Sequence, residues 1–223
     1  WFLVECLLCR QVFSETERFL NIILMAKDSD GVCSTCQNSF EKIGDSHCPT
    51  CFRKGEIRTC LDCHEWKKQD HQVQHEALFT YNAFMKDYFS KYKFQGDMVL
   101  SQVLAKPIKN HLKYYKDYTL VPVPLSPERL RDRQFNQVTT FLDSAGLSYQ
   151  DILEKTDVQK QSDKNRHERL KSQNPFTIKS QKSLPERVLI VDDIYTTGAT
   201  LKGIYDLLHQ AGVKNVKSFS IAR

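Results

Sequence analysis

The chain has 223 residues, an apolar share of 40% and a formal net charge of +5 at pH 7. This length holds one large domain or a medium domain with a small one, and the mild basic charge permits contact with nucleic acid or phosphorylated ligands without requiring it. The apolar run over residues 19–26 is interrupted by Asn21 and is too short to span a bilayer. Because no basic segment precedes the apolar opening, we expect no signal peptide, no stable membrane insertion and a cytoplasmic location.

All eight cysteines lie in the first 63 residues, in four pairs with Cys-x-x-Cys spacing. Without a secretion signal, such pairs are more plausibly metal ligands than disulfides. Zinc prefers four thiolates in a tetrahedron, so four pairs predict two saturated, structural sites. The short connection between two of the pairs predicts one site from Cys48, Cys51, Cys60 and Cys63. The other site then takes Cys6, Cys9, Cys33 and Cys36, although spacing alone leaves an interleaved pairing open.

Other uses of paired cysteines fit this pattern less well. No strand–turn–helix pattern of a redox protein surrounds them, and iron–sulfur clusters usually have three ligands close together. Residues 1–72 contain few apolar side chains, so we expect them to form a small zinc-binding domain that the metal largely stabilises. Residues 73–223 are the second predicted domain. Zinc ribbons bind DNA, RNA or protein, and the fold alone does not decide between them.

From residue 73 onward, strand and helix patterns alternate. Residues 77–81 predict a short strand. Apolar residues at helical spacing predict a helix over residues 83–94, ending at Gly96, and a second helix over residues 97–115 that Pro107 kinks or splits.

Residues 119–125 predict a strand that runs into a rigid proline-rich loop, and residues 135–145 predict a helix. Residues 155–174 are polar and without periodicity, which predicts a long mobile loop. The remaining expected elements are a brief strand over 175–178, a buried strand over 188–191, a helix over 200–210 and a strand over 216–221. This alternation predicts an α/β domain with a parallel sheet at its core.

Residues 188–200 carry the most specific functional pattern. An apolar strand leads to Asp192 and Asp193, and a loop of small and hydroxylated residues then opens a helix. The loop residues are Thr196, Thr197, Gly198, Ala199 and Thr200. Backbone N–H groups at a helix N-terminus bind phosphate, glycine permits close approach, and paired carboxylates suit a vicinal diol. The alternative is a plain strand–helix connection in which the aspartates cap the helix.

This segment matches the phosphoribosyl pyrophosphate signature of type I phosphoribosyltransferases, and the whole chain resembles the ComF family. Besides the cysteine pairs, the segments that carry the resemblance are Tyr-Lys-Phe-Gln-Gly-Asp (92–97), Val-Pro-Val-Pro-Leu-Ser (121–126), Arg-Gln-Phe-Asn-Gln (133–137) and Ser-Ile-Ala-Arg (220–223). Gln134 stands where the family usually has glycine, and the insert between Cys9 and Cys33 is long. The implied fold is α/β: a parallel-sheet, type I phosphoribosyltransferase-like domain preceded by a small Cys-rich domain with two zinc sites.

The resemblance also implies roles for individual residues. Asp192 and Asp193 would be the catalytic pair that holds the ribose hydroxyls, and residues 196–200 would bind the 5-phosphate. The loop at 122–126 would lie at the pyrophosphate, with Mg²⁺ bridging pyrophosphate and diol oxygens. The candidate pyrophosphate contacts are Arg129, Arg131 and Arg133. The segment with Lys164, Arg166 and Arg169 could close over the site as a lid and exclude water. The alternative is that this segment is a solvated loop.

Two functions follow from this resemblance. The first is a late competence role in natural transformation, in which the chain assists uptake and handling of single-stranded DNA beside the ATPase ComFA. The second is an active phosphoribosyltransferase that transfers ribose 5-phosphate to an unidentified acceptor and releases pyrophosphate. Interleaved aromatic and basic residues over 86–94 and 113–116 are compatible with single-strand binding. At helical spacing they more often fill a core, and we prefer that interpretation.

Overall fold

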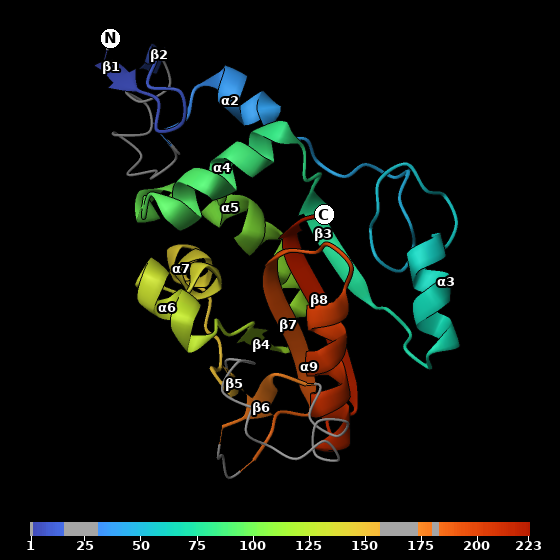
Figure 1. Cartoon of the computed structure of the whole chain (residues 1–223). Coiled ribbons are helices and arrows are strands. Elements are labelled where there is room, and N and C mark those ends of the chain that lie inside the picture. The colour runs from blue at the N-terminus through green and yellow to red at the C-terminus, as the bar shows by residue number, and fades with distance from the viewer. Residues whose placement is uncertain (1, 16–30, 157–173, 180–182) are drawn as a thin grey trace.

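A computed structural model describes residues 2–15, 31–156, 174–179 and 183–223. Two small Cys-rich modules precede the central sheet. The first module (residues 2–15 and 31–40) contains the antiparallel strands β1 (Phe2–Glu5) and β2 (Val12–Glu15) and helix α2 (Ser34–Ser39). The second module (residues 45–70) contains helix α3 (Leu61–Lys68). Figure 1 shows the first module beside α4 and the second beside the sheet edge formed by β3.

A four-stranded parallel sheet forms the centre of the molecule, as predicted. Its order is β3 (His75–Phe79), β8 (Asn215–Ala222), β7 (Arg187–Ile194) and β4 (Thr119–Pro122). The residues from Val188 to Val191 in β7 are all buried. A continuous apolar run is what a parallel strand covered on both faces requires.

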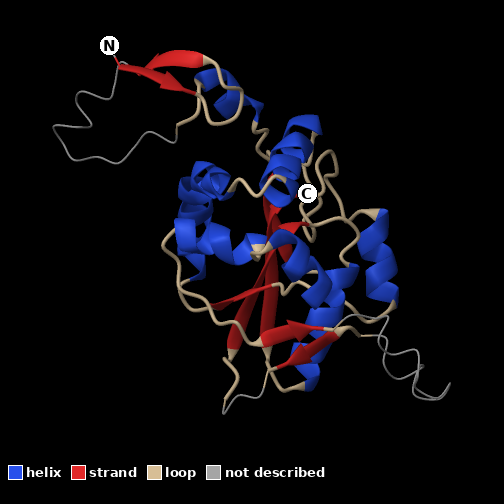
Figure 2. Cartoon of the chain, turned by 60° about the vertical axis from the view of Figure 1, so that its left-hand side comes forward, coloured by secondary structure: helices blue, strands red, loops and turns tan. Residues whose placement is uncertain are grey.

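Helices cover both faces of this sheet (Figures 1 and 2). Since successive side chains of a strand point to opposite faces, β7 divides its residues between two cores. Leu189 and Val191 pack in one core with α4 (Ala83–Phe94), α5 (Ser101–Leu112) and α7 (Gln137–Ser144). Val188 and Ile190 pack in the other with α9 (Ala199–Gln210). Among the described residues, no helix is both long and apolar enough to cross a membrane.

The helix predicted over residues 83–94 is confirmed, but Pro107 does not split the next one. The segment over residues 97–115 consists of the short 3-10 helices η1 (Met98–Leu100) and η2 (Lys113–Tyr115) on either side of a continuous α5. Buried residues on both sides of Pro107 hold α5 against the core despite the missing N–H: Val103, Leu104, Ile108 and Leu112. The interleaved aromatic residues mainly fill that core, which is the interpretation preferred from the sequence. Tyr88, Phe89, Tyr92 and Tyr115 are all buried.

Two short elements were not among those that the sequence predicted. Helix α6 (Pro127–Arg133) follows β4, with Ser126 as its N-cap and Pro127 in its first turn, a common helix start. Strand β5 (Leu153–Lys155) pairs antiparallel with β6 (Phe176–Ile178), and this second strand was predicted. Most of the predicted loop over 155–174, with Lys164, Arg166 and Arg169, lies outside the described residues.

Candidate functional site

The eight cysteines form two clusters with the predicted membership, and the interleaved pairing does not occur. In each cluster the four sulfur atoms lie within 4.8 Å of one another: Cys6, Cys9, Cys33 and Cys36 in the first, Cys48, Cys51, Cys60 and Cys63 in the second. A tetrahedral ion with metal–sulfur bonds of about 2.3 Å places its sulfurs about 3.8 Å apart. The Sγ–Sγ distances of 3.8 Å (Cys9–Cys33), 3.7 Å (Cys51–Cys60) and 4.0 Å (Cys48–Cys63) match that spacing. Both clusters therefore have the geometry of a metal site with four cysteine ligands.

The two modules repeat one local design in their first cysteine turn. The N–H of Arg10 donates to the carbonyl of Cys6 at 2.9 Å, and the N–H of Phe52 donates to that of Cys48 at 2.9 Å. Arg10 and Phe52 both adopt a left-handed backbone, with φ of 64° and 60°. The sequence spacing predicted the metal ligands, and the structure adds that the two turns are equivalent.

The second cysteine turn of each module is also repeated. Cys33 and Cys60 are the N-caps of α2 and α3, and their N–H groups point at Cys6 Sγ and Cys48 Sγ, each at 3.4 Å. Burial acts to raise the pKa of Cys6, but backbone hydrogen bonds outweigh it and lower the pKa to about 6. Burial raises the pKa of Cys51 to about 11. A bound cation would deprotonate such buried thiols, so the donor set suits zinc in chemistry as well as geometry.

The loop after β7 lies at a topological switch point. Strands β4 and β7 are neighbours, but the chain leaves β4 toward α7 on one face and leaves β7 toward α9 on the other. Crevices of this kind, at the carboxyl ends of parallel strands, bind ligands in α/β proteins. Asp192 and Asp193 lie here near the end of β7, which runs on to Ile194 and is therefore longer than the strand predicted over residues 188–191.

Asp193 is held by two side chains on the face covered by α4 and α7. Lys93 Nζ lies 2.5 Å from its Oδ2, and Gln137 Nε2 donates to the same oxygen at 3.1 Å. The side chains of Lys93 and Asp193 are only 13% and 8% exposed, so this ion pair is largely shielded from water. Arg133 extends the network by donating to Gln137 Oε1 at 3.0 Å. The carboxylate is therefore a fixed part of the α/β domain.

Asp192 points to the opposite face and is half-buried. Its Oδ1 accepts a hydrogen bond from the N–H of Asp193 at 2.9 Å. Burial, and then the charge of Asp193, raise the pKa of Asp192 well above its ordinary value. Lys93 and Lys155 lie near enough to Asp192 to act electrostatically: Lys93 opposes the rise in the pKa of Asp192, and Asp192 opposes the lowering of the pKa of Lys155 by burial and Arg129. Basic groups thus surround one carboxyl that resists ionisation.

The turn into α9 has the features of an anion-binding loop. Gly198 is its N-cap, buried, with φ of 86°, and a Cβ there would collide with the Tyr195 hydroxyl. Thr196, Thr197 and Ala199 are exposed, and Thr200 is half-buried. The first N–H groups of a helix have no acceptor within the helix and carry its positive dipole end. The predicted loop residues are therefore together at this N-terminus, where the N–H of Ala199 donates to Thr197 Oγ1 at 3.4 Å.

The three candidate arginines of α6 differ in their surroundings. Burial lowers the pKa of Arg133, Asp193 opposes this shift and Arg129 adds to it. Arg129 and Arg133 therefore both lie close enough to the site to contribute positive charge there. Arg131 is exposed, and its side chain bonds to no described residue. Gln134, which stands where the family usually has glycine, has φ of 64° and donates its N–H to Leu130 O at 2.8 Å. The turn therefore forms with glutamine, at a backbone cost of about 1–2 kcal/mol.

Comparison with known proteins agrees with this arrangement. A family model described as a phosphoribosyl transferase domain matches residues 144–223. The chain is 45% identical to competence protein ComFC of Streptococcus pneumoniae over 99% of its own length and 100% of that protein. It is 32% identical to competence protein ComFC of Bacillus subtilis, over 98% and 94% of the two chains. The chain belongs to the ComFC family of competence proteins.

Two further matches have lower sequence identity. Competence protein F of Haemophilus influenzae is 25% identical to the chain, over 87% of this chain and 91% of that protein. A crystal structure of a hypoxanthine phosphoribosyltransferase from Staphylococcus aureus is 21% identical, with a TM-score of 0.33, covering 55% of this chain and 63% of that one. Membership of the ComFC family supports a role in competence for this chain.

Four residues beside the site escaped prediction: Lys93, Gln137, Trp66 and Arg223. Lys93, Gln137 and Arg223 stand in segments that carried the family resemblance, but the sequence alone suggested no partner for them. Trp66 follows the last cysteine by three residues, and its indole reaches Thr197 O at 3.0 Å. Each of these contacts joins segments far apart in the sequence, which is why local patterns do not reveal them.

Proposed function

We propose that the chain acts in natural competence, in the cytoplasm, by binding phosphoribosyl pyrophosphate at the β7–α9 loop and handling single-stranded DNA beside a ComFA-type ATPase. The observation that carries the ligand proposal is the combination of Asp192, the buried Gly198 turn and the open N-terminus of α9 at one switch point. Identity of 45% to a ComFC protein over its full length supports the competence role. In this proposal each four-cysteine cluster holds one zinc ion.

Acidic and basic side chains would bind different parts of the ligand. Asp192 is the acid available to the ribose hydroxyls, because Lys93 and Gln137 already hold Asp193. Mg²⁺ favours phosphate oxygens with few carboxylates, so it would arrive with the pyrophosphate and neutralise part of its charge, with Asp192 as the nearby acid. Arg129 and Arg133 supply positive charge for the pyrophosphate, whereas Arg131 is not favoured by its surroundings.

Contact with single-stranded DNA is supported by two exposed aromatic rings. The side chains of Phe94 and Tyr114 are 75% and 77% exposed. Arg133 lies over the Phe94 ring at 5.5 Å, and Lys113 lies over the Tyr114 ring at 5.0 Å. An exposed ring beside a cation offers a base both stacking and charge attraction. Phe94 directly follows Lys93, so one of these rings stands beside the phosphoribosyl site.

A second candidate function is transfer of the ribose 5-phosphate group. The raised pKa of Asp192 favours it, because a raised pKa makes the carboxylate a stronger base for a proton of the acceptor. In this reaction the bond from ribose to pyrophosphate breaks, a bond from ribose to the acceptor forms, and the acceptor's proton passes to the carboxylate. Screening nucleobases, amines and single-stranded DNA for pyrophosphate release separates this enzyme from a binding module.

Calorimetric titration with phosphoribosyl pyrophosphate and Mg²⁺ tests the ligand site. We expect binding to the parent chain and at least a tenfold loss of affinity in Asp192→Asn. Asp206→Asn is the matched control, because this half-buried carboxylate pairs with Lys202 one turn further along α9 than the loop. An absence of binding heat for the parent, or equal affinity of the parent and Asp192→Asn, contradicts the proposal.

The DNA and ATPase parts of the proposal need separate measurements. Fluorescence anisotropy with a labelled oligonucleotide should give weaker binding for the double variant Phe94→Ala with Tyr114→Ala than for Ile57→Ala, whose side chain is also exposed. Affinity that is equal in these variants contradicts stacking at these rings. A pull-down with ComFA, with and without residues 1–72, tests whether the Cys-rich modules make the ATPase contact.

A further inference from the structure

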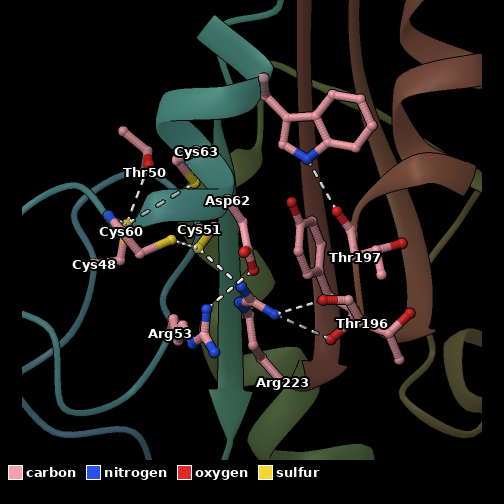
Figure 3. A network of polar contacts seen from close by, with 12 residues as sticks. Cys48, Thr50, Cys51, Arg53, Cys60, Asp62, Cys63, Thr196, Thr197 and Arg223 are labelled. Carbon is pink, nitrogen blue, oxygen red and sulfur yellow. Dashed lines mark hydrogen bonds and ion pairs between the residues drawn. The ribbon is translucent and has the colours of Figure 1, made fainter.

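The side chain of Arg223 bridges the second cysteine cluster and the phosphate-binding loop (Figure 3). Its Nη2 donates to Cys51 Sγ at 3.1 Å, and its Nη1 donates to Thr196 O at 2.8 Å and approaches Tyr195 O at 3.5 Å. The planar guanidinium fork presents donors in fixed directions and can serve two acceptors at once. One side chain therefore connects a sulfur of the cluster directly to the backbone of the loop.

Arg223 is itself fixed in place. Its guanidinium lies over the Tyr195 ring, 4.3 Å from the centroid. Its main-chain N–H donates to Phe79 O at 2.9 Å, and its carbonyl accepts from the N–H of Tyr81 at 2.8 Å. These contacts anchor both ends of the residue to the edge of the sheet, so the bridge is held rather than swinging between partners.

Trp66 forms a second connection from the same module to the same loop. Its Nε1 donates to Thr197 O at 3.0 Å. Trp66 lies on α3, whose N-cap is Cys60 and whose first turn contains Cys63. The two cysteines that would bind the metal therefore also set the position of the helix that carries the indole.

These two contacts fix the direction of the loop's N–H groups. In a trans peptide the carbonyl of one residue and the N–H of the next point in opposite directions. Arg223 holds Thr196 O and Trp66 holds Thr197 O, so the N–H groups of Thr197 and Gly198 are directed away from the second module. Those are donors at the start of α9, where a phosphate would accept them.

From this geometry we propose that the second Cys-rich module positions the phosphate-binding loop, with Arg223 as the positioning residue, so that metal in the second cluster controls the order of the loop. A metal ion with four thiolates keeps a net negative charge, which strengthens the hydrogen bond from the guanidinium. The inference rests on the proposed function, because it assigns the loop to phosphate binding.

The first module makes no such connection among the described residues. Its side-chain polar contacts with the α/β domain are from Lys91 Nζ to Leu8 O at 3.4 Å and from Asn82 Nδ2 to Ser39 O at 3.5 Å, and both donors belong to α4 or its N-cap. Cys6, Cys33 and Cys36 pack in the core on the face of α4, away from α9. The first module therefore serves as an internal control for any effect of metal loss.

The order of the loop in the ligand-free, full-length, zinc-loaded chain tests the inference. We expect ¹⁵N relaxation order parameters for Thr197 and Gly198 near about 0.85 in the parent and below about 0.6 in Arg223→Gln. Arg223→Lys should also loosen the loop while both zinc ions remain, because it keeps the charge and loses the fork. Arg53→Gln is the matched control: this arginine pairs with Asp62 at 3.0 Å beside the same cluster and has no contact with the loop. It should leave both values unchanged.

A comparison of the two clusters extends the test. Cys60→Ser should loosen the loop and lower the affinity for phosphoribosyl pyrophosphate by at least tenfold, whereas Cys33→Ser should change that affinity less than twofold. The inference is overturned if the parent binds the ligand and the loop nevertheless stays rigid in both Arg223→Gln and Cys60→Ser. A loop that loosens in a chain whose parent binds no ligand supports the positioning role and contradicts the proposed function instead.

Discussion

On the α4 side of the sheet, the tip of β7 is fixed from within the α/β domain, whereas on the α9 side it is fixed from a separate module. Lys93 and Gln137 hold the carboxylate of Asp193 on the first side. On the second side, Arg223 and Trp66 hold main-chain carbonyls of the loop. The two Cys-rich modules share one local design, but only the second reaches the loop among the described residues. Two cysteine clusters of the same design can therefore differ in what depends on them, because their contacts with the rest of the molecule differ.

The largest expected effect is a loss of stability when the ion pair on the α4 side is removed. Lys93→Met leaves Asp193 without its ionic partner at a site that is only 8% exposed. Removing one member of a buried pair costs about 3–5 kcal/mol of stability. Lys68→Met is the control, because its pair with Glu65 is 71% and 64% exposed and worth about 1 kcal/mol or less. Urea unfolding of both variants measures the difference in the free energy of unfolding. Equal losses would show that the buried pair contributes no more to stability than an exposed one.

A smaller effect is expected when the glycine of the loop on the α9 side is replaced. Gly198 and Gly212 both have positive φ, at 86° and 92°, so alanine at either position costs about 1–2 kcal/mol of backbone energy. Only at Gly198 would the new Cβ also collide with Tyr195. Gly198→Ala should therefore lose clearly more stability than Gly212→Ala and should bind phosphoribosyl pyrophosphate at least tenfold more weakly. Thermal unfolding and calorimetry measure the two effects, and equal behaviour of the variants contradicts the crowded turn.

The smallest effect depends on pH and concerns Asp192, which lies between the two sides. Its folded-state pKa is raised by burial and by Asp193. A carboxyl of this kind contributes stability that is fully present below its unfolded pKa and is lost as pH rises through the folded value. Asp192→Asn should therefore be more stable than the parent at about pH 8, with the difference shrinking toward about pH 5.5. A difference that grows as the pH falls contradicts the assignment.

The sequence was sufficient for patterns that depend on neighbours along the chain. The Cys-x-x-Cys spacing predicted both clusters, and the apolar run before Asp192 predicted the central parallel strand and its loop. The split that was one of the two effects predicted for Pro107 does not occur, because core packing on both sides keeps α5 continuous. The three-residue strand β5 is too short to leave a periodic pattern, and it exists because β6 pairs with it.

The polar contacts of the site could not be predicted in this way. Lys93 and Asp193 are a hundred residues apart in the sequence, and Arg223 meets Cys51 from the far end of the chain. The adjacent acids also looked equivalent in sequence, but strand geometry sends them to opposite faces, where one is paired and the other is open. Charge and spacing identify such residues as candidates, and only the packing of the sheet assigns their partners.

The most direct test of the central claim follows both clusters while ligand binds. The chain is loaded with cadmium at both four-cysteine sites, and its two sets of ¹¹³Cd resonances are recorded during titration with phosphoribosyl pyrophosphate and Mg²⁺. Because coupling between two sites is reciprocal, ligand at the loop must act back on the second cluster. We predict that the resonance of the second cluster shifts and that of the first does not. Saturating ligand, confirmed by calorimetry, with both resonances unmoved would contradict the account.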